Sequence, residues 1–128
     1  MALVTVLASA GCGAVVVDPT CTNELRTGIR LTLEDSTTGA RYPFTDVVAV
    51  ASGGAFRDTA RVASITEASG GQPSVGLAHE RPGTYDVTVS AAGYAAWTTR
   101  GVRVEEEEVC HHVITRSLTA RLRPLATP

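Results

Sequence analysis

The clearest pattern in this chain is a strict alternation of apolar and polar residues in the segment that follows Pro82-Gly83. Pro-Gly is a turn dipeptide, so a strand is predicted to begin directly after it. In an extended strand, alternate side chains point to the same face, which places one apolar row inward. The members of this row are Tyr85, Val87 and Val89. A break at residues 92–94 separates this strand from a second extended segment, which ends at Val104.

Five other segments carry patterns that are typical of strands. Residues 27–34 alternate cleanly, whereas residues 46–51 are apolar on both faces and are predicted to form a central strand. The other three segments are residues 55–62, 74–79 and 113–122. In the last of these, the side chains expected to close the domain are Ile114, Leu118, Ala120 and Leu122. The residues predicted to form one core are Ile29, Leu31, Leu33, Val48, Tyr85, Val87, Val89 and Leu118.

Turn signals separate these segments. Residues 35–39 are rich in side chains that hydrogen-bond their own backbone, and residues 52–54 are predicted to make a hairpin. No segment shows the periodicity of a long amphipathic helix. Strands at this spacing predict an all-β domain, specifically a seven-stranded antiparallel Greek-key β-sandwich.

Three motifs in this pattern occur together in one known family. A strand is followed by D-x-x-T-G at residues 35–39, and P-G-x-Y-x-V-x-V at residues 82–89 is followed by G-Y at residues 93–94. Residues 21–125 thereby resemble the carboxypeptidase regulatory-like domain of bacterial exported proteins. The resemblance implies a prealbumin-like, or transthyretin-like, β-sandwich that acts as a non-enzymatic accessory domain. It also implies a cysteine at the place of Cys110, which acidic residues precede.

Composition narrows the class of partner. The chain has 128 residues, enough for one core, and 44% of them are hydrophobic, mostly Ala and Val. The net charge of −2 provides no basic footprint, so no nucleic-acid partner is expected. All 11 basic residues are Arg. Arg forms forked hydrogen bonds with carboxylate and phosphate, although the codon usage of a GC-rich genome also explains Arg without Lys.

The first residues have the composition of an export signal. Residues 1–11 are apolar and small, too short to span a bilayer as a helix, and they lead directly into Cys12. The sequence before Cys12 resembles a bacterial lipobox, with Ser9 at the position where Leu is usual and no basic residue ahead of it. We therefore expect residues 1–11 to be a truncated lipoprotein signal, Cys12 to be lipidated, and residues 12–20 to be a tether. An ordinary secretory signal and an edge strand over residues 3–7 are the alternatives.

Three cysteines leave one unpaired in an exported protein. If lipid occupies Cys12, then Cys21 and Cys110 remain to form one disulfide between the start and the end of the domain. Such a wide loop stabilises by about 4–5 kcal/mol in the chain-entropy description. Two buried free thiols in a cytosolic protein are the alternative.

Two polar clusters invite a metal interpretation. Cys110, His111 and His112 are adjacent, and His79 is a further imidazole, but adjacent strand residues point to opposite faces and cannot readily share one ion. Residues 105–108 are four glutamates that lack the Asp, Asn and Gly spacing of a calcium loop. We expect no metal and no cofactor, with both histidines facing solvent and the glutamates in a solvated turn.

Catalytic motifs are also missing from the sequence. His79-Glu80 is not followed by the second histidine of H-E-x-x-H, because Pro82-Gly83 comes next. Hydroxyisourate hydrolases share the transthyretin-like fold but close with Tyr-Arg-Gly-Ser, which does not occur at the end of this sequence. We therefore expect no enzymatic activity.

Trp97 and Tyr94 are the candidate ligand contacts, because two rings side by side can stack on a sugar. The small residues 95–96, however, favour an indole packed over the sheet in a core or half-buried role. The sequence thus predicts an exported accessory or binding domain, held at a membrane surface of the cell envelope through Cys12. Its expected partner is a cell-envelope protein or glycan. A periplasmic sugar- or peptide-binding module is the first alternative, and a hydroxyisourate hydrolase-type enzyme is the second.

Overall fold

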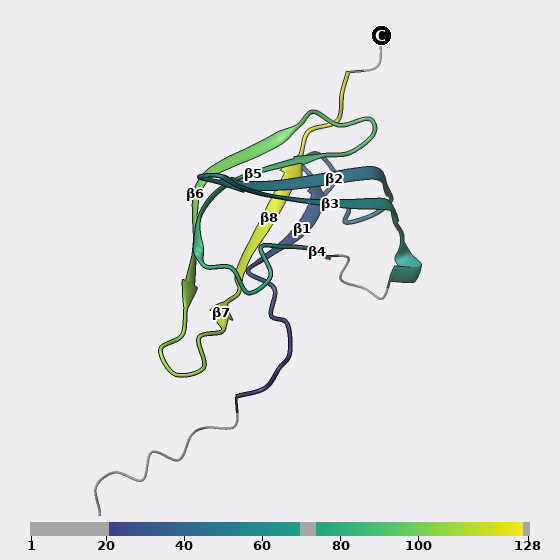
Figure 1. Cartoon of the computed structure of the whole chain (residues 1–128). Helices are drawn as coiled ribbons and strands as arrows, with labels where there is room; N and C mark the ends of the chain where they lie inside the picture. The colour runs from purple at the N-terminus through teal and green to yellow at the C-terminus, as the bar shows by residue number, and fades with distance from the viewer. Residues whose placement is uncertain (1–20, 70–73, 127–128) are drawn as a thin grey trace, which may run out of the picture.

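The computed structural model describes residues 21–69 and 74–126, which consist mainly of β-strands (Figure 1). One turn of 3-10 helix, Glu67–Ser69, is the only helical element in this part of the chain. The strands are β1 (Ile29–Asp35), β2 (Phe44–Gly53), β3 (Phe56–Ile65), β4 (Ser74–Leu77), β5 (Gly83–Ser90), β6 (Trp97–Glu106), β7 (Val113–Ile114) and β8 (Arg116–Leu122). The predicted all-β class is confirmed.

These strands form two sheets that share one core. The smaller sheet has the order β4-β1-β8, and the larger has the order β3-β2-β5-β6-β7. In Figure 1, β6 follows the larger sheet and then bends down toward β7. A register shift between Tyr85 and Val87, where β5 pairs with β6, accompanies this bend. The result is a sandwich whose five-stranded layer curls like half of a barrel.

The predicted final strand, residues 113–122, is divided in the structure, so the described residues form eight strands rather than seven. Thr115 interrupts it, and the Thr115 hydroxyl donates to the backbone oxygen of Thr27 at 2.7 Å. β7 belongs to the five-stranded sheet, whereas β8 belongs to the three-stranded sheet. Because the chain changes sheet at Thr115, a single pattern of alternating inward and outward side chains cannot describe both β7 and β8. Val113 is buried and Ile114 is exposed, so the inward position expected for Ile114 is wrong.

The predicted purely antiparallel pairing is wrong at one place, since β1 and β8 are parallel. The amide of Arg116 donates to the carbonyl oxygen of Gly28 at 2.8 Å, directly before β1 begins. Both strands therefore start at the same end of the sheet. Their register runs from Ile29 opposite Arg116 to Asp35 opposite Leu122.

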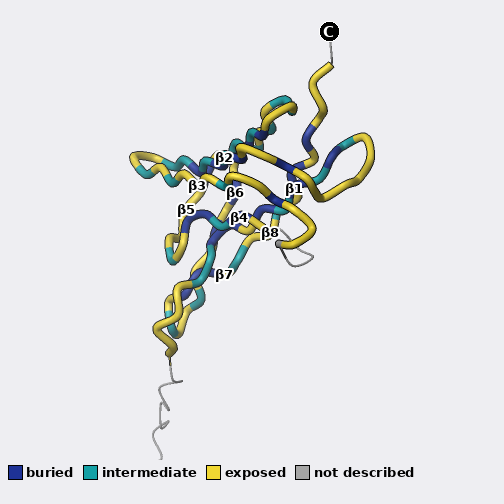
Figure 2. The backbone as a smooth tube through the Cα atoms, turned by 90° about the vertical axis from the view of Figure 1, so that its right-hand side faces the viewer, coloured by how far each residue is buried: buried dark blue, intermediate teal, exposed yellow. Residues whose placement is uncertain are grey.

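The core lies between the two sheets and includes all but two of the predicted core residues (Figure 2). Leu118 is partly buried and packs against this core. Val48 is the error: Val47 points inward, and Val48 lies on the opposite face of β2. The pattern could not separate the two because this segment is apolar on both faces. Asp46 adopts a left-handed conformation with φ of 50°, and both Phe44 and Val47 are buried although they are three positions apart, a spacing that places side chains on opposite faces of a regular strand.

The first and last described residues lie at opposite ends of the molecule (Figures 1 and 2). The segment after β8 pairs with the loop before β6, through hydrogen bonds of 2.9 Å from Ala95 to Arg123 and from Leu125 to Gly93. Residues 21–28 leave the other end, next to the loop between β6 and β7. A cluster of hydrogen-bonded polar side chains lies at that end.

Candidate functional site

A disulfide attaches the N-terminal segment to the sandwich. It joins Cys21 to Cys110, whose Cα atoms are 5.5 Å apart, across 89 residues of sequence. Cys110 lies in the loop between β6 and β7, so this loop and the first described residue are held together. The predicted pairing is confirmed. Cys12 lies outside the described residues, and its lipidation stays a prediction.

Next to the disulfide, Arg26, Glu80 and His112 form a cluster that we term the polar junction. The His112 imidazole lies between two acceptors: Nδ1 is 2.7 Å from the Glu80 carboxylate, and Nε2 is 2.8 Å from the backbone oxygen of Thr22. A neutral imidazole carries one N–H, whereas an imidazolium carries two. The geometry therefore favours the protonated form of His112, which donates to both neighbours.

The titration properties of the polar junction agree with this geometry. The pKa of His112 is raised above its ordinary value of 6.5, mainly by the hydrogen bond to Glu80, with partial desolvation acting in the opposite direction. The pKa of Glu80 is lowered, mainly by the backbone amide of Arg26, which donates to Oε1 at 2.7 Å. The amide of Val113 donates to Oε2 of Glu80 at 3.4 Å. The junction is thus an ion pair in which the Glu80 carboxylate accepts two backbone amides and the His112 ring donates to a backbone carbonyl oxygen.

An unusual turn between β4 and β5 presents Glu80 to the junction. Ala78 and Glu80 have positive φ angles of 53° and 49°, which are uncommon for residues other than Gly. Asp58 of β3 accepts the amide hydrogen of Ala78 at 2.8 Å. Gly28 packs against the same turn so closely that a Cβ there would collide with the carbonyl oxygen of Ala78. Contacts from β3 and from the N-terminal segment therefore hold the turn in this conformation.

The two adjacent histidines have separate environments. His111 is exposed, with Nδ1 2.6 Å from Oε1 of Glu106, whereas His112 is only 8% exposed. The expectation that neighbouring side chains diverge is confirmed. The expectation that both face solvent is wrong for His112, because Glu80 and the N-terminal segment enclose its ring.

His79 and the glutamates also contribute to the fold. His79 lies over Gly76 of β4, with Nδ1 3.3 Å from the hydroxyl of Thr27. The glutamates at 105–108 are shared between the end of β6 and the loop that follows, and Glu107 is 3.4 Å from the Arg26 guanidinium. Within residues 21–69 and 74–126, no three His, Cys, Asp or Glu side chains are grouped so that they could hold a metal ion.

The two candidate ligand contacts are half-buried. The Tyr94 hydroxyl donates to Oδ2 of Asp35 at 2.8 Å, and the Tyr94 ring packs against Phe44 with centroids 5.2 Å apart. Trp97 begins β6 opposite Val89 and packs against the core. Both side chains thus have structural roles, and contact with a sugar or peptide stays a prediction for each.

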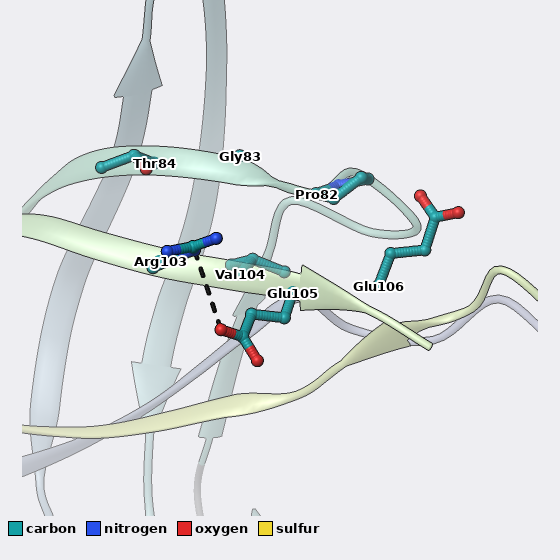
Figure 3. A pocket seen from close by; sticks show the side chains of 7 residues that line it. All are labelled: Pro82, Gly83, Thr84, Arg103, Val104, Glu105 and Glu106. Atoms are coloured by element: carbon teal, nitrogen blue, oxygen red, sulfur yellow. Dashed lines mark ion pairs between the residues drawn. The ribbon is translucent and has the colours of Figure 1, made fainter. Parts of the chain in front are cut away.

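An open hollow of about 580 Å³ lies where β5 begins and β6 ends (Figure 3). Its lining residues are Pro82, Gly83, Thr84, Arg103, Val104, Glu105 and Glu106. The Arg103 guanidinium is 3.7 Å from the Glu105 carboxylate, and both side chains are mostly exposed. A shallow polar surface whose charges are already paired differs from the enclosed, mainly apolar sites that bind small molecules.

Sequence inspection missed the residues that build the polar junction. In the sequence, Glu80 is marked only by an incomplete H-E-x-x-H motif, and no motif includes Arg26. Glu80 and His112 are 32 residues apart, and no local spacing signals such a pair. The one available signal was the position of His112, two residues after a cysteine predicted to be bonded to the N-terminal segment.

No protein-family model matches the sequence, and no curated protein matches it. In the part of the chain that the structure describes, no helix is long and apolar enough to cross a membrane. The function is therefore inferred from the disulfide, the polar junction and the sequence before them.

Proposed function

We propose that this protein is a non-enzymatic accessory domain of the cell envelope, exported and displayed on a membrane surface through lipid on Cys12. The observation that carries the proposal is the disulfide between Cys21 and Cys110. Disulfides form and persist in oxidising compartments outside the cytoplasm. Residues 1–11 have the apolar composition of a signal that would deliver the chain to such a compartment.

The position of the disulfide supports attachment at this end of the molecule. Residues 13–20 would connect a lipidated Cys12 to Cys21, over at most roughly 30 Å when fully extended. A pull on that tether reaches the sandwich at Cys21, where the disulfide transmits it to the loop between β6 and β7. The polar junction then secures the following residues through Thr22 and Arg26. A domain displayed on a tether has to keep its attachment point folded under a pull, and the disulfide and the polar junction both stabilise that point.

The family proposal rests on the motifs and on their places in the fold. We infer a prealbumin-like Greek-key sandwich of the carboxypeptidase regulatory-like type. In support, Asp35 of D-x-x-T-G accepts the amides of Thr37 and Thr38 at 2.8 and 3.0 Å. Tyr85 of the second motif is buried in the core. An accessory domain of this type acts by binding through its exposed surface. We therefore infer that it binds a cell-envelope protein or glycan and does not catalyse a reaction.

Detergent phase partitioning tests the anchor. The wild-type protein, expressed with export machinery, should enter the detergent phase, and Cys12→Ser should stay in the aqueous phase. Cys21→Ser is the matched control: it removes a cysteine and the disulfide but should leave the detergent partitioning intact. More than one acyl chain is needed for firm retention, so the difference should be large. Identical aqueous partitioning of wild type and Cys12→Ser would contradict the proposal.

A further inference from the structure

Among the strands of residues 21–69 and 74–126, β3 is an edge of the five-stranded sheet and pairs only with β2. It is ten residues long, and its sequence contains neither Pro nor Gly. A long edge strand presents unpaired N–H and C=O groups along its free side, and another extended segment can hydrogen-bond to them. β3 therefore offers a backbone template along one side of the sandwich.

The two faces of β3 have different chemistry. On the face toward the core, Phe56, Ala60 and Val62 are only half-buried. An added strand could therefore pack apolar side chains beside them. On the opposite face, Arg57 and Arg61 are exposed. The edge thus combines a partly covered apolar side with a cationic side.

Arg57 and Arg61 have no acidic residue opposite them in the ladder with β2. Their neighbours across the ladder, Ser52 and Val48, are neutral. Neither guanidinium forms an ion pair with another residue of the ranges 21–69 and 74–126. Asp58, which lies between them in sequence, points to the other face and accepts the amide of Ala78. The planar guanidinium group matches a carboxylate in geometry as well as charge.

We propose that β3 binds an extended acidic segment of a partner protein by strand addition. In an antiparallel pair, opposite residues share a face. The bound segment then has two acidic residues, four positions apart, opposite Arg61 and Arg57. It has apolar residues opposite Val62 and Ala60. The sequence Val-Glu-Val-Thr-Ser-Glu, read from the position opposite Val62, has this pattern.

A hollow at one end of β3 provides a place for the first apolar side chain of that segment. Its volume is about 360 Å³. Its lining residues are Asp46, Val47, Val48, Arg61, Val62 and Ala63. Three valines give it apolar walls, and the charged residues Arg61 and Asp46 lie beside them. Strand addition gains its sequence specificity from side-chain pockets of this kind next to the paired backbone.

A second copy of this chain is a poorer occupant. In an antiparallel pair of β3 strands centred on Thr59, each Arg57 lies opposite an Arg61, which creates two repulsive contacts. Acidic side chains convert the same positions into ion pairs. The inference goes beyond membrane display and does not depend on Cys12, so either proposal can fail while the other stands.

The test uses the full chain and a synthetic peptide, Ser-Val-Glu-Val-Thr-Ser-Glu-Ser, with blocked ends. Binding is measured by fluorescence anisotropy at low ionic strength, and the site is located by amide chemical-shift changes. We expect shifts concentrated on β3. Arg57→Glu with Arg61→Glu should weaken binding about tenfold or more, which corresponds to about 1.4 kcal/mol. The matched double variant, Arg30→Glu with Arg100→Glu, makes the same charge change at exposed residues away from β3 and should bind within about twofold of wild type.

A peptide with Lys in place of both Glu residues is the reciprocal probe. It should not bind wild type, and it should bind the Arg57→Glu, Arg61→Glu variant. If that variant does not fold, the comparison of the two peptides on wild-type protein still decides the question. Equal binding of both peptides, no binding of the acidic peptide, shifts away from β3, or dimerisation of the protein through β3 would each overturn the proposal.

Discussion

The imidazole Nδ1 of His112 lies 2.7 Å from the carboxylate of Glu80, a residue 32 positions earlier in the chain. Because Nε2 of the same ring is 2.8 Å from the backbone oxygen of Thr22, a single protonated side chain joins β7, the turn before β5 and the N-terminal segment. The neighbouring disulfide joins nearly the same segments covalently. The end of the sandwich at which the described residues begin is thus held by two independent connections.

The ion pair predicts a specific dependence of stability on pH. The pKa of His112 is raised in the folded protein, mainly by the hydrogen bond to Glu80. The stabilisation of the fold by protonated His112 is therefore fully present below pH 6.5 and is lost as pH rises through the raised pKa. Thermal unfolding of wild type and His112→Asn should therefore differ most in mildly acidic solution. The difference in Tm should shrink as the solution becomes alkaline.

His111→Asn is the control for this experiment. His111 is exposed, and Asn tolerates the positive φ of 59° at this position. Because its contact with Glu106 is exposed, His111→Asn should change Tm much less than His112→Asn does in mildly acidic solution. Stability at low pH provides a second check. The pKa of Glu80 is lowered, mainly by the amide of Arg26, so the stabilisation of the fold by the ionised Glu80 carboxylate is lost as pH falls through that lowered pKa. A difference between wild type and His112→Asn that grows toward alkaline pH would refute the assignment.

Loss of the disulfide should cost substantial stability. The bond between Cys21 and Cys110 closes a loop with a sequence separation of 89 residues. The double variant Cys21→Ser, Cys110→Ser should lower the free energy of unfolding by about 2–5 kcal/mol. Chemical denaturation with and without reductant measures this value on wild type as well. A change below about 0.5 kcal/mol in both experiments would show that the N-terminal segment contributes little to the fold.

A matched pair of substitutions tests the inward face of β2. Val47 is fully buried, and Val48 is half-exposed on the opposite face. Val47→Asp should lower the free energy of unfolding by about 3 kcal/mol or more, because it places a carboxylate in the core. Val48→Asp should cost about 1 kcal/mol, the scale of a strand-propensity change. The reverse order, measured by urea denaturation, would mean that the faces are assigned the wrong way round.

The contrast between β5 and β2 shows what sequence patterns could establish. In β5, polar residues separate Tyr85, Val87 and Val89, so the buried face was evident, and all three are in the core. In β2, Val47 and Val48 are adjacent apolar residues, and only the backbone conformation at Asp46 and the pairing with neighbouring strands select between them. Alternation carries information about a face only where the other face is polar.

The divided last strand and the polar junction have a different cause. At Thr115 the chain passes from one sheet to the other, and nothing in the local pattern marks the change. Glu80 and His112 meet only because the fold brings distant segments together. Local turn chemistry was predictable, as in the hydrogen bonds of Asp35 to the next turn. Contacts between distant segments depend on topology, which the single sequence did not supply.

Trp97 is the only tryptophan in the chain and reports directly on its own environment. Because the ring packs against the core, Trp97→Ala should lower the free energy of unfolding by about 2 kcal/mol, less than for a fully buried aromatic side chain. The fluorescence emission of the native protein should not change when oligosaccharides are added. A saturable change in emission, together with glycan-array binding that depends on Trp97, would favour the sugar-binding alternative.

Peptide mass mapping of the membrane-associated protein without reduction tests the central claim most directly. It reads the N-terminal residue, the modification of Cys12 and the pairing of the cysteines in one measurement. The account predicts a chain that begins at a lipid-modified Cys12, together with a cross-linked pair of peptides containing Cys21 and Cys110. An unmodified N-terminus at Met1, or a bridge between Cys12 and Cys21, would contradict it.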